Sequence, residues 1–259
     1  MEENAAMVTE AQSEGRIANE GRASQVTPDF LQRALGGLNT PLNTSALLQK
    51  LLLEAFPGRV AVVSSFGADA AVLLDLVARI DTATPVLFLD TGKHFPETLA
   101  YRAQLTQRLL LSDVRVLMAA PAALQTVDPM GTLWRETPDS CCDARKVTPL
   151  AAALTGFDAW ISGRKRHPSE SRRTLPIFEN DAERIKINPL AMWTAEQVDG
   201  YYASFGLPRH PLFHQGYPSI GCTPCTAKPA PGADSRSGRW PGVDKTECGI
   251  HRVTWDVGL

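Results

Sequence analysis

Two patterns of apolar positions alternate along the chain. Between residues 45 and 56 the leucines recur at helical spacing, and the Pro-Gly pair at 57–58 ends the predicted helix. Residues 60–63 form an unbroken apolar run, which is typical of a strand buried on both faces of a parallel sheet. The two patterns recur as predicted helices at 72–80, 96–109 and about 141–154, and as predicted strands at 85–89, 114–118 and 158–163. Four alternations of strand and helix predict an α/β fold with a parallel sheet and right-handed crossovers.

The pattern changes after residue 186. A short helix is predicted to begin after Thr194, a suitable N-cap residue with Gln197 three positions later. From Pro208 to Pro241 the chain is rich in proline and glycine and shows little periodicity. Such a long loop is rare in a compact domain unless something tethers it. We therefore expect residues 208–259 to be tethered onto an α/β domain of residues 28–207.

Composition and charge exclude two broad classes of protein. The chain has 259 residues with 26 basic and 28 acidic side chains, hence a net charge of −2 and a pI near 6.2. This balance argues against a nucleic-acid or membrane partner, and no apolar run is long enough to span a bilayer. Residues 1–27 are polar and rich in glutamate, unlike a signal or transit peptide, so we predict a disordered tail. A cytoplasmic protein with reduced thiols is expected.

The cysteines are distributed in a way that needs a chemical explanation. Cys141 and Cys142 are adjacent, Cys222 and Cys225 form a C-x-x-C pair, and Cys248 stands apart. Adjacent cysteines rarely form a disulfide with each other, because the short ring is strained. Four thiolates are enough for zinc or for an iron–sulfur cluster, and this spacing leaves the metal open. Buried free thiols are the alternative.

The fifth cysteine lies in the segment Glu-Cys-Gly-Ile-His at 247–251. A lone cysteine beside a glycine, with a histidine three residues later, could be a mobile nucleophile. Basic neighbours would lower its pKa and increase the fraction of thiolate. An exposed cysteine without a function fits the same pattern equally well.

Polar loops containing glycine follow three of the predicted strands, at 64–69, 90–93 and 162–166. The carboxyl ends of parallel strands meet at one edge of a sheet, where such folds bind their ligands. The third loop leads through Arg172 and Arg173 and so carries a cluster of cations, which favours an anionic ligand. Ordinary strand–helix turns and a solvated basic surface are the alternatives.

Taken together, these segments resemble the assimilatory adenylyl-sulfate (APS) reductases, in the family that also contains the phosphoadenylyl-sulfate (PAPS) reductases. The resemblance spans roughly residues 45–255 and depends on the order and spacing of SSFGADAAVLL at 64–74, LDTGKHFPET at 89–98, CCxxxK at 141–146, CxxC at 222–225 and ECGIH at 247–251. It implies an open, mostly parallel twisted sheet of the adenine-nucleotide α-hydrolase (PP-loop) type with an irregular C-terminal segment.

The resemblance also implies a reaction. Cys248 would attack the sulfur of APS and expel AMP, leaving an S-sulfocysteine from which thioredoxin or glutaredoxin releases sulfite. One [4Fe–4S] cluster per subunit would be bound by Cys141, Cys142, Cys222 and Cys225.

The substrate-binding residues are likewise implied by the resemblance. Lys146 would link cluster and substrate, and Arg172, with Arg173 as the near alternative, would match an arginine beyond the fourth strand. The other matching positions are Ser64, Ser65, Phe66 and Gly67 in a modified phosphate loop, Leu89, Asp90 and Thr91 near the nucleotide, Arg236 and Arg239 as a phosphosulfate-binding pair, and His251. The sequence departs from the family pattern at Ile250, where leucine is common, and after Gly163, where it reads Arg-Lys-Arg-His.

Three other functions remain open at this point. PAPS reductases usually lack the four cluster cysteines, so their presence favours APS. An ATP-pyrophosphatase loop typically reads Ser-Gly-Gly-x-Asp-Ser, whereas residues 65–70 keep one of those two glycines. A non-catalytic zinc module would use the same four cysteines. A homo-oligomer is possible, and the sequence does not decide it.

Overall fold

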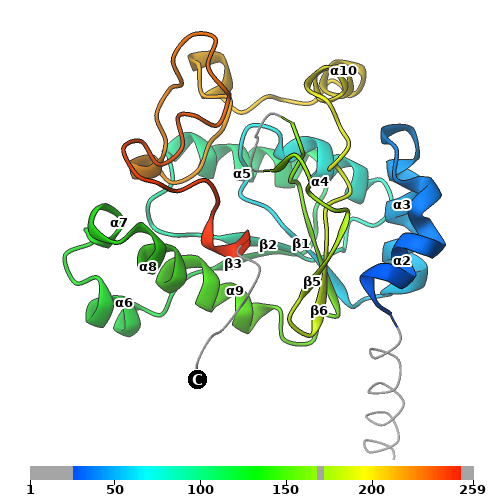
Figure 1. Ribbon diagram of the computed structural model, residues 1–259, viewed down its shortest axis with the longest axis horizontal. Coiled ribbons are helices and arrows are strands. Elements are labelled where there is room, and N and C mark those ends of the chain that lie inside the picture. Colours follow the sequence, from blue (N-terminus) through cyan, green and yellow to red (C-terminus); the bar gives the residue numbers. More distant parts are fainter. Residues whose placement is uncertain (1–25, 168–171, 252–259) are drawn as a thin grey trace, which may run out of the picture.

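A single open sheet forms the centre of the molecule in the computed structural model, which describes residues 26–167 and 172–251 (Figure 1). Its strand order is β3-β2-β1-β4-β6-β5. The strands are β1 (Val60–Val63), β2 (Val86–Leu89), β3 (Val114–Leu117), β4 (Ala159–Ser162), β5 (Phe178–Asp181) and β6 (Arg184–Ile187). Neighbouring strands are parallel except β5, which runs antiparallel to β6. The prediction of an α/β fold with a mostly parallel sheet is confirmed.

The buried strands are those predicted from unbroken apolar runs. Every residue of β1, β2 and β4 is buried, whereas the edge strand β3 is partly exposed. Strands β5 and β6 were not predicted, because charged residues interrupt both of them. The predicted tail of residues 1–27 lies outside the described residues as far as residue 25.

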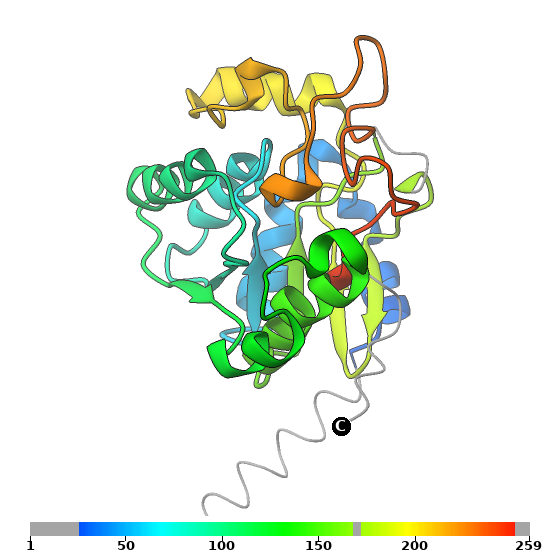
Figure 2. The ribbon, with the colours of Figure 1, turned by 90° about the vertical axis from the view of Figure 1, so that its left-hand side faces the viewer.

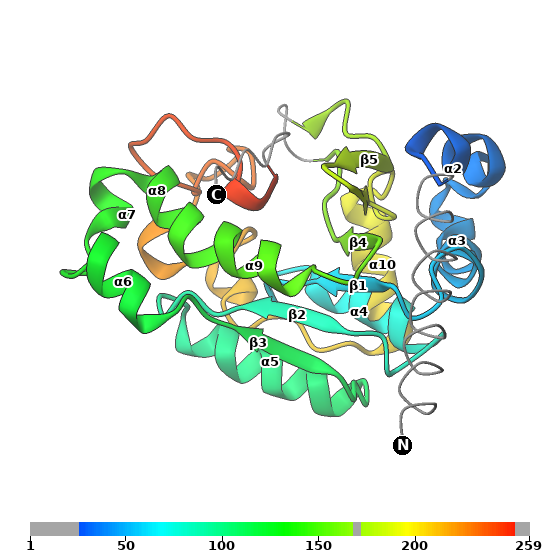
Figure 3. The same ribbon diagram turned by 90° about the horizontal axis from the view of Figure 1, so that it is seen from below.

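Helices cover both faces of the sheet (Figure 3). One face carries the larger apolar cluster, to which the N-terminal helices and α4, α5 and α10 contribute, and α9 packs over the opposite face. The helices on the first face are α2 (Pro28–Leu35), α3 (Thr44–Lys50) with a π-helical continuation at Leu51–Ala55, α4 (Ala70–Ala78), α5 (Pro96–Arg108) and α10 (Ala195–Phe205). Short helices α6 (Pro121–Val127) and α7 (Leu133–Glu136) follow β3. No helix among the described residues is long and apolar enough to cross a bilayer.

The double cysteine begins a helical run that is not a uniform α-helix. Helix α8 (Pro138–Cys142) continues into a π-helical turn at Asp143–Val147 and then into α9 (Thr148–Ala153). Pro149 lies in the first turn of α9, where the missing N–H of proline costs no hydrogen bond. The predicted helix through residue 154 therefore exists, and the π turn accommodates its proline.

The C-terminal segment contains little regular structure and is attached to the domain by backbone contacts. Cys222 forms an isolated antiparallel bridge with His94, and the Thr223 amide donates to the Lys93 carbonyl oxygen at 2.7 Å. The segment then folds back on itself and reaches a short turn, Gly249–His251, which lies near the helical run that contains the double cysteine (Figure 2). The predicted irregular segment is thus packed on the α/β domain.

Helix α10 offers a test of a prediction from sequence. Thr194 and Gln197 form the predicted capping box, with the Thr194 amide donating to the Gln197 side chain at 2.9 Å and the Gln197 amide to Thr194 Oγ1 at 3.3 Å. We expect Thr194→Ala to lower the free energy of unfolding by about 1 kcal/mol, because the Gln197 amide loses its side-chain acceptor. Urea denaturation measures this change. A midpoint equal to that of the parent protein would contradict it, and Thr194→Ser should retain most of the stability.

Candidate active site

A cleft opens where the loops after β1 and β4 face the C-terminal segment. It is lined by ten of the residues that the sequence placed at the active site, namely Ser64, Ser65, Gly67, Leu89, Lys146, Arg172, Arg236, Arg239, Cys248 and His251. Arg164, Lys165 and His167 from the loop after β4 also line it. The structure therefore brings together residues from five distant parts of the sequence, including both of the arginine sets that the resemblance implied.

Three predicted nucleotide-site residues do not line this cleft. Phe66 is fully buried against Phe88, with ring centroids 5.6 Å apart, and it adopts a positive φ of 48° that bulky residues rarely take. Asp90 accepts a hydrogen bond from the Gly92 amide at 2.9 Å, and the Thr91 hydroxyl lies 3.3 Å from the Cys222 sulfur. These side chains shape the loops around the cleft. Arg172 lines it and Arg173 does not.

The Cys248 thiol lies inside the cleft beside the ammonium group of Lys146, with Nζ 3.6 Å from Sγ. A hydrogen bond from the Cys142 thiol, together with the charges of Lys146 and Arg239, holds the pKa of Cys248 well below its ordinary value despite burial. Burial would lower the pKa of Lys146, but the nearby sulfur atoms of Cys248, Cys222 and Cys142 raise it. Cys248 thus lies beside cations that favour its thiolate form, as a nucleophile requires.

The residues after Cys248 attach the C-terminal segment to the sheet. Ile250 is buried in the apolar cluster that α9 forms over the sheet. The His251 ring stacks on Trp160 of β4, with centroids 6.1 Å apart and an interplanar angle of 11°. Burial and the surrounding cations, first among them Arg164, keep the pKa of His251 well below its ordinary value. His251 is therefore a neutral imidazole, and its buried Nδ1 has no hydrogen-bond partner among the described residues.

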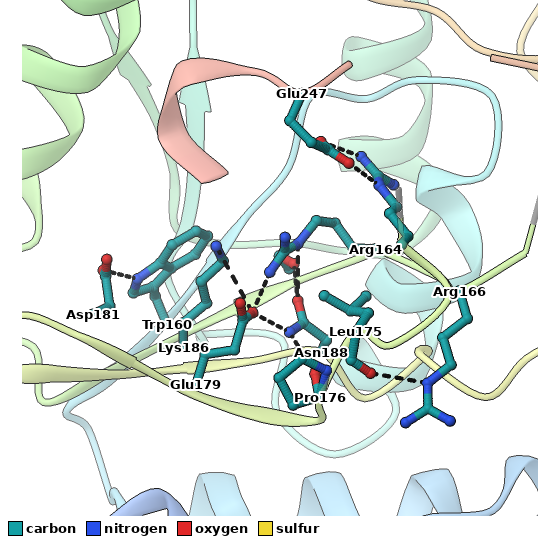
Figure 4. A network of polar contacts seen from close by, with 12 residues as sticks. Trp160, Arg164, Arg166, Leu175, Pro176, Glu179, Asp181, Lys186, Asn188 and Glu247 are labelled. Atoms are coloured by element: carbon teal, nitrogen blue, oxygen red, sulfur yellow. Dashed lines mark hydrogen bonds and ion pairs between the residues drawn. The ribbon is translucent and has the colours of Figure 1, made fainter. Parts of the chain in front are cut away.

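A network of polar contacts behind the cleft holds Trp160 and Arg164 in place (Figure 4). Trp160 Nε1 donates to Asp181 at 2.6 Å, and Arg164 donates to Glu179 and to Asn188. The Lys186 ammonium lies 5.0 Å from the Trp160 ring centroid, and burial lowers its pKa to about 8. Sequence reasoning missed these partners because β5 and β6 were not predicted. The sequence offers only a run of charged residues at 179–186 as a signal, and of these Asp181 and Lys186 are buried.

Arg239 reaches the cleft because the residue beside it is a glycine. A Cβ atom at Gly221 would lie 2.2 Å from Arg239 Nη2, so any larger residue would displace the guanidinium. Arg239 Nε also donates to the Cys225 carbonyl oxygen at 3.3 Å, and its guanidinium lies 4.6 Å from the Trp240 ring centroid. Sequence reasoning did not single out Gly221, although it directly precedes the C-x-x-C pair.

The four remaining cysteines are free thiols: Cys141 and Cys225 lie near Cys222, whereas Cys142 forms a hydrogen bond with Cys248. Cys141, Cys142 and Cys222 are buried and Cys225 is half-buried. Burial, reinforced by the neighbouring Cys222 thiol, raises the pKa of Cys225 to about 11. Burial also raises the pKa of Cys141, which lies near Cys222 as well. Thiols placed together in this way would release their protons on binding a metal.

The four thiols are the donor type of a zinc site or of an iron–sulfur cluster. Within residues 26–167 and 172–251, no three His, Cys, Asp or Glu side chains are close enough to hold one metal ion. An iron–sulfur cubane distributes four thiolates over four irons, so its ligands lie further apart than those of one zinc ion. Four thiols without a disulfide, drawn from α8 and the C-x-x-C turn, supply the donor atoms that either group would use.

Comparison with known proteins shows the family. The phosphoadenosine phosphosulfate reductase domain matches residues 59–228, and the chain belongs to this family. Among its relatives is the adenosine 5'-phosphosulfate reductase of Mesorhizobium japonicum, 48% identical over 226 residues that cover 87% of this chain and 88% of that protein. The protein of the same name from Mycobacterium tuberculosis is 46% identical over 195 residues, covering 73% and 75% of the two chains. The family expected from the motifs is confirmed.

Two solved structures have a fold similar to that of this chain. The phosphoadenylyl-sulfate reductase from Candida auris, crystallised as a phosphate complex, aligns with a TM-score of 0.64 at 25% identity, covering 77% of this chain and 96% of that one. The FMN adenylyltransferase of Candida glabrata aligns with a TM-score of 0.52 at 14% identity, covering 82% and 75%. This second likeness concerns the fold alone, and both structures agree with the predicted fold class.

Proposed function

We propose that this protein reduces adenosine 5'-phosphosulfate to sulfite and AMP, with Cys248 as the nucleophile. The observation that carries the proposal is the Cys248 sulfur 3.6 Å from Lys146 Nζ, in a cleft lined by arginines. Relatives at 46–52% identity that bear the name adenosine 5'-phosphosulfate reductase support the choice of substrate.

The proposed chemistry takes place in two steps. In the first, the Cys248 thiolate attacks the sulfur of the phosphosulfate, so that an S–S bond forms, the S–O bond to AMP breaks and AMP leaves with the electron pair. In the second, one thiol of a reduced dithiol protein, thioredoxin or glutaredoxin, attacks Cys248 and releases sulfite. The partner's second thiol would then complete its disulfide and free Cys248 as a thiol.

Cations make the first step possible. A thiolate that approaches a phosphosulfate brings negative charge toward negative charge, and this repulsion must be screened. Lys146 and Arg239 lie near Cys248, while Arg172 and Arg236 line the same cleft. In this proposal Lys146 stabilises the attacking sulfur, and the arginines hold the phosphosulfate oxygens. The neutral His251 beside them would contact the substrate as a hydrogen-bonding group without adding charge.

We further propose that Cys141, Cys142, Cys222 and Cys225 hold one [4Fe–4S] cluster. When bound, the cluster would supply a redox-active, thiolate-ligated centre next to the substrate. Its four protein ligands join α8 to the irregular segment, and this provides the tether that so long a loop needs. Five free thiols also favour a reducing compartment, so we propose that the protein is cytoplasmic.

The function is tested by anaerobic purification followed by measurement of sulfite released from APS in the presence of reduced thioredoxin. We expect thioredoxin-dependent sulfite release, and a brown protein that contains iron and sulfide. APS and PAPS should be supplied together in a second assay. A preference for PAPS would contradict the choice of substrate, and zinc without iron would favour the non-catalytic zinc module.

We expect Lys146→Ala to lower kcat/KM for APS by roughly 100-fold while the iron content stays close to that of the parent protein. The reason is that Lys146 lies beside the nucleophile and is not one of the proposed cluster ligands. Lys93→Ala is a matched control, since Lys93 donates to the Gly131 carbonyl oxygen at 2.7 Å outside the cleft. Equal losses of rate and iron in Lys146→Ala would make the lysine a structural residue.

A further inference from the structure

The residue before the nucleophile already occupies part of the anion site. Arg172 donates two hydrogen bonds to the Glu247 carboxylate, one of them from Nη2 at 2.7 Å. Arg236 Nη2 lies 3.7 Å from the same carboxylate and donates to the Thr246 carbonyl oxygen at 3.0 Å. All three side chains are largely buried, and Figure 4 shows Glu247 with its paired contacts above the polar network. Two arginines of the proposed substrate site thus face a carboxylate of the protein itself.

The Glu247 carboxylate is charged in this position. Burial would raise its pKa, but the hydrogen bonds from Arg172 and the charges of Arg172, Arg236 and Arg164 lower it below the ordinary value. By contrast, no carboxylate among the described residues forms an ion pair with Arg239. Arg172 and Arg236 therefore share one carboxylate, whereas Arg239 has no carboxylate partner among the described residues.

We propose that Glu247 is an internal anion that competes with the phosphosulfate for Arg172 and Arg236, and that its ion pairs hold the C-terminal segment around Cys248 in place until substrate arrives. The inference rests on the proposed function. A guanidinium group that already binds a carboxylate through two N–H donors cannot offer the same two donors to a second anion. Substrate must therefore displace Glu247 from at least one arginine, and the free energy of that displacement is subtracted from its affinity.

Competition at the arginines links substrate binding to the position of the tail. Glu247 and Cys248 are adjacent, so an anion that displaces the carboxylate also loosens the segment that carries the nucleophile. By reciprocity, anything that favours the docked carboxylate weakens substrate binding by the same factor. This arrangement would hold Cys248 in a fixed position in the substrate-free enzyme. It would also favour the departure of AMP, because Glu247 can return to the arginines.

The test compares equilibrium binding of APS to chains that cannot turn it over. In a Cys248→Ser background, we expect Glu247→Gln to lower the Kd for APS roughly 5-fold or more, because the neutral amide no longer competes for the arginines. Glutamine has the same shape as glutamate, and thermal unfolding of the variant shows whether it is folded. The matched control is Asp139→Asn, which removes the ion pair that anchors Lys245 of the same tail without touching either arginine.

Each outcome decides the inference. A lower Kd with Glu247→Gln and an unchanged Kd with Asp139→Asn support competition at the arginines. Equal tightening by both substitutions would overturn it, because loosening of the tail alone would then explain the effect. An unchanged or higher Kd with Glu247→Gln would also overturn it, and would make Glu247 an anchor of the substrate-bound state. If the Cys248→Ser parent fails to bind APS at all, the proposed function fails as well.

Discussion

Cys248→Ser is expected to lower the rate of sulfite release from APS by roughly a thousand-fold or more, while the protein keeps its iron and its brown colour. A serine hydroxyl beside Lys146 is not ionised at neutral pH and is a poor nucleophile toward sulfur. The substitution leaves the four thiols of the proposed cluster site in place. Steady-state assay with reduced thioredoxin, together with iron analysis and a visible spectrum of the same preparation, measures both effects.

The two readouts of this variant separate the roles of the cysteines. Incubation of the parent protein with APS alone should leave a sulfo group on Cys248, which mass spectrometry detects as added mass on the tail peptide. The Cys248→Ser chain should not acquire that mass. Loss of colour from Cys248→Ser would show that the division between cluster ligands and nucleophile is wrong.

Cys222→Ser is expected to remove most of the iron and to reduce activity to a similarly low level. Cys222 is buried, its backbone bridges to His94, and the Thr91 hydroxyl lies 3.3 Å from its sulfur. Loss of this ligand should also loosen residues 208–241, because metal binding and folding of the tethered segment are coupled. Iron and sulfide analysis measures the first effect, and the rate of limited proteolysis measures the second.

The comparison of Cys222→Ser with Cys248→Ser is internally controlled, because both make the same atomic change in one chain. Iron should be lost in the first variant and retained in the second. A Cys222→Ser protein that keeps its iron and its spectrum would contradict the proposed ligand set. Zinc in the parent protein would contradict the metal itself.

The central strands could be predicted because their sequence and their environment agree. β1, β2 and β4 are buried along their whole length, and in the sequence they read as short apolar runs that leave no polar face. The β5–β6 hairpin could not be predicted in this way. Lys186 is buried, yet its charge is balanced by Glu179 on the other strand and by the face of Trp160. From the sequence alone, a lysine in a short segment is predicted to lie at the surface, because its buried partners are not known.

Candidate-site residues that belong to a sequence motif could be predicted. Residues whose role depends on contacts between distant parts of the chain could not. The motifs led to Cys248, Lys146 and the arginines, and the structure places them in one cleft. No pattern in the sequence shows that Gly221 must remain small, since its neighbour Arg239 lies eighteen positions away. The pairing of Glu247 with Arg172 is likewise a long-range contact, so the Glu-Cys-Gly-Ile-His segment alone gave no reason to assign the glutamate a role.

The π turn at Asp143–Val147 limits how this chain can change over evolution. A π turn holds one more residue than the α-helical turn it replaces, and such turns often occur at functional sites. Deleting one residue between Cys142 and Lys146 would restore a regular helical turn and bring Lys146 from the fourth to the third position after Cys142. Lys146 would then no longer be held in register with both Cys142 and Cys248. The number of residues between the cysteine pair and α9 is therefore constrained as tightly as their identity.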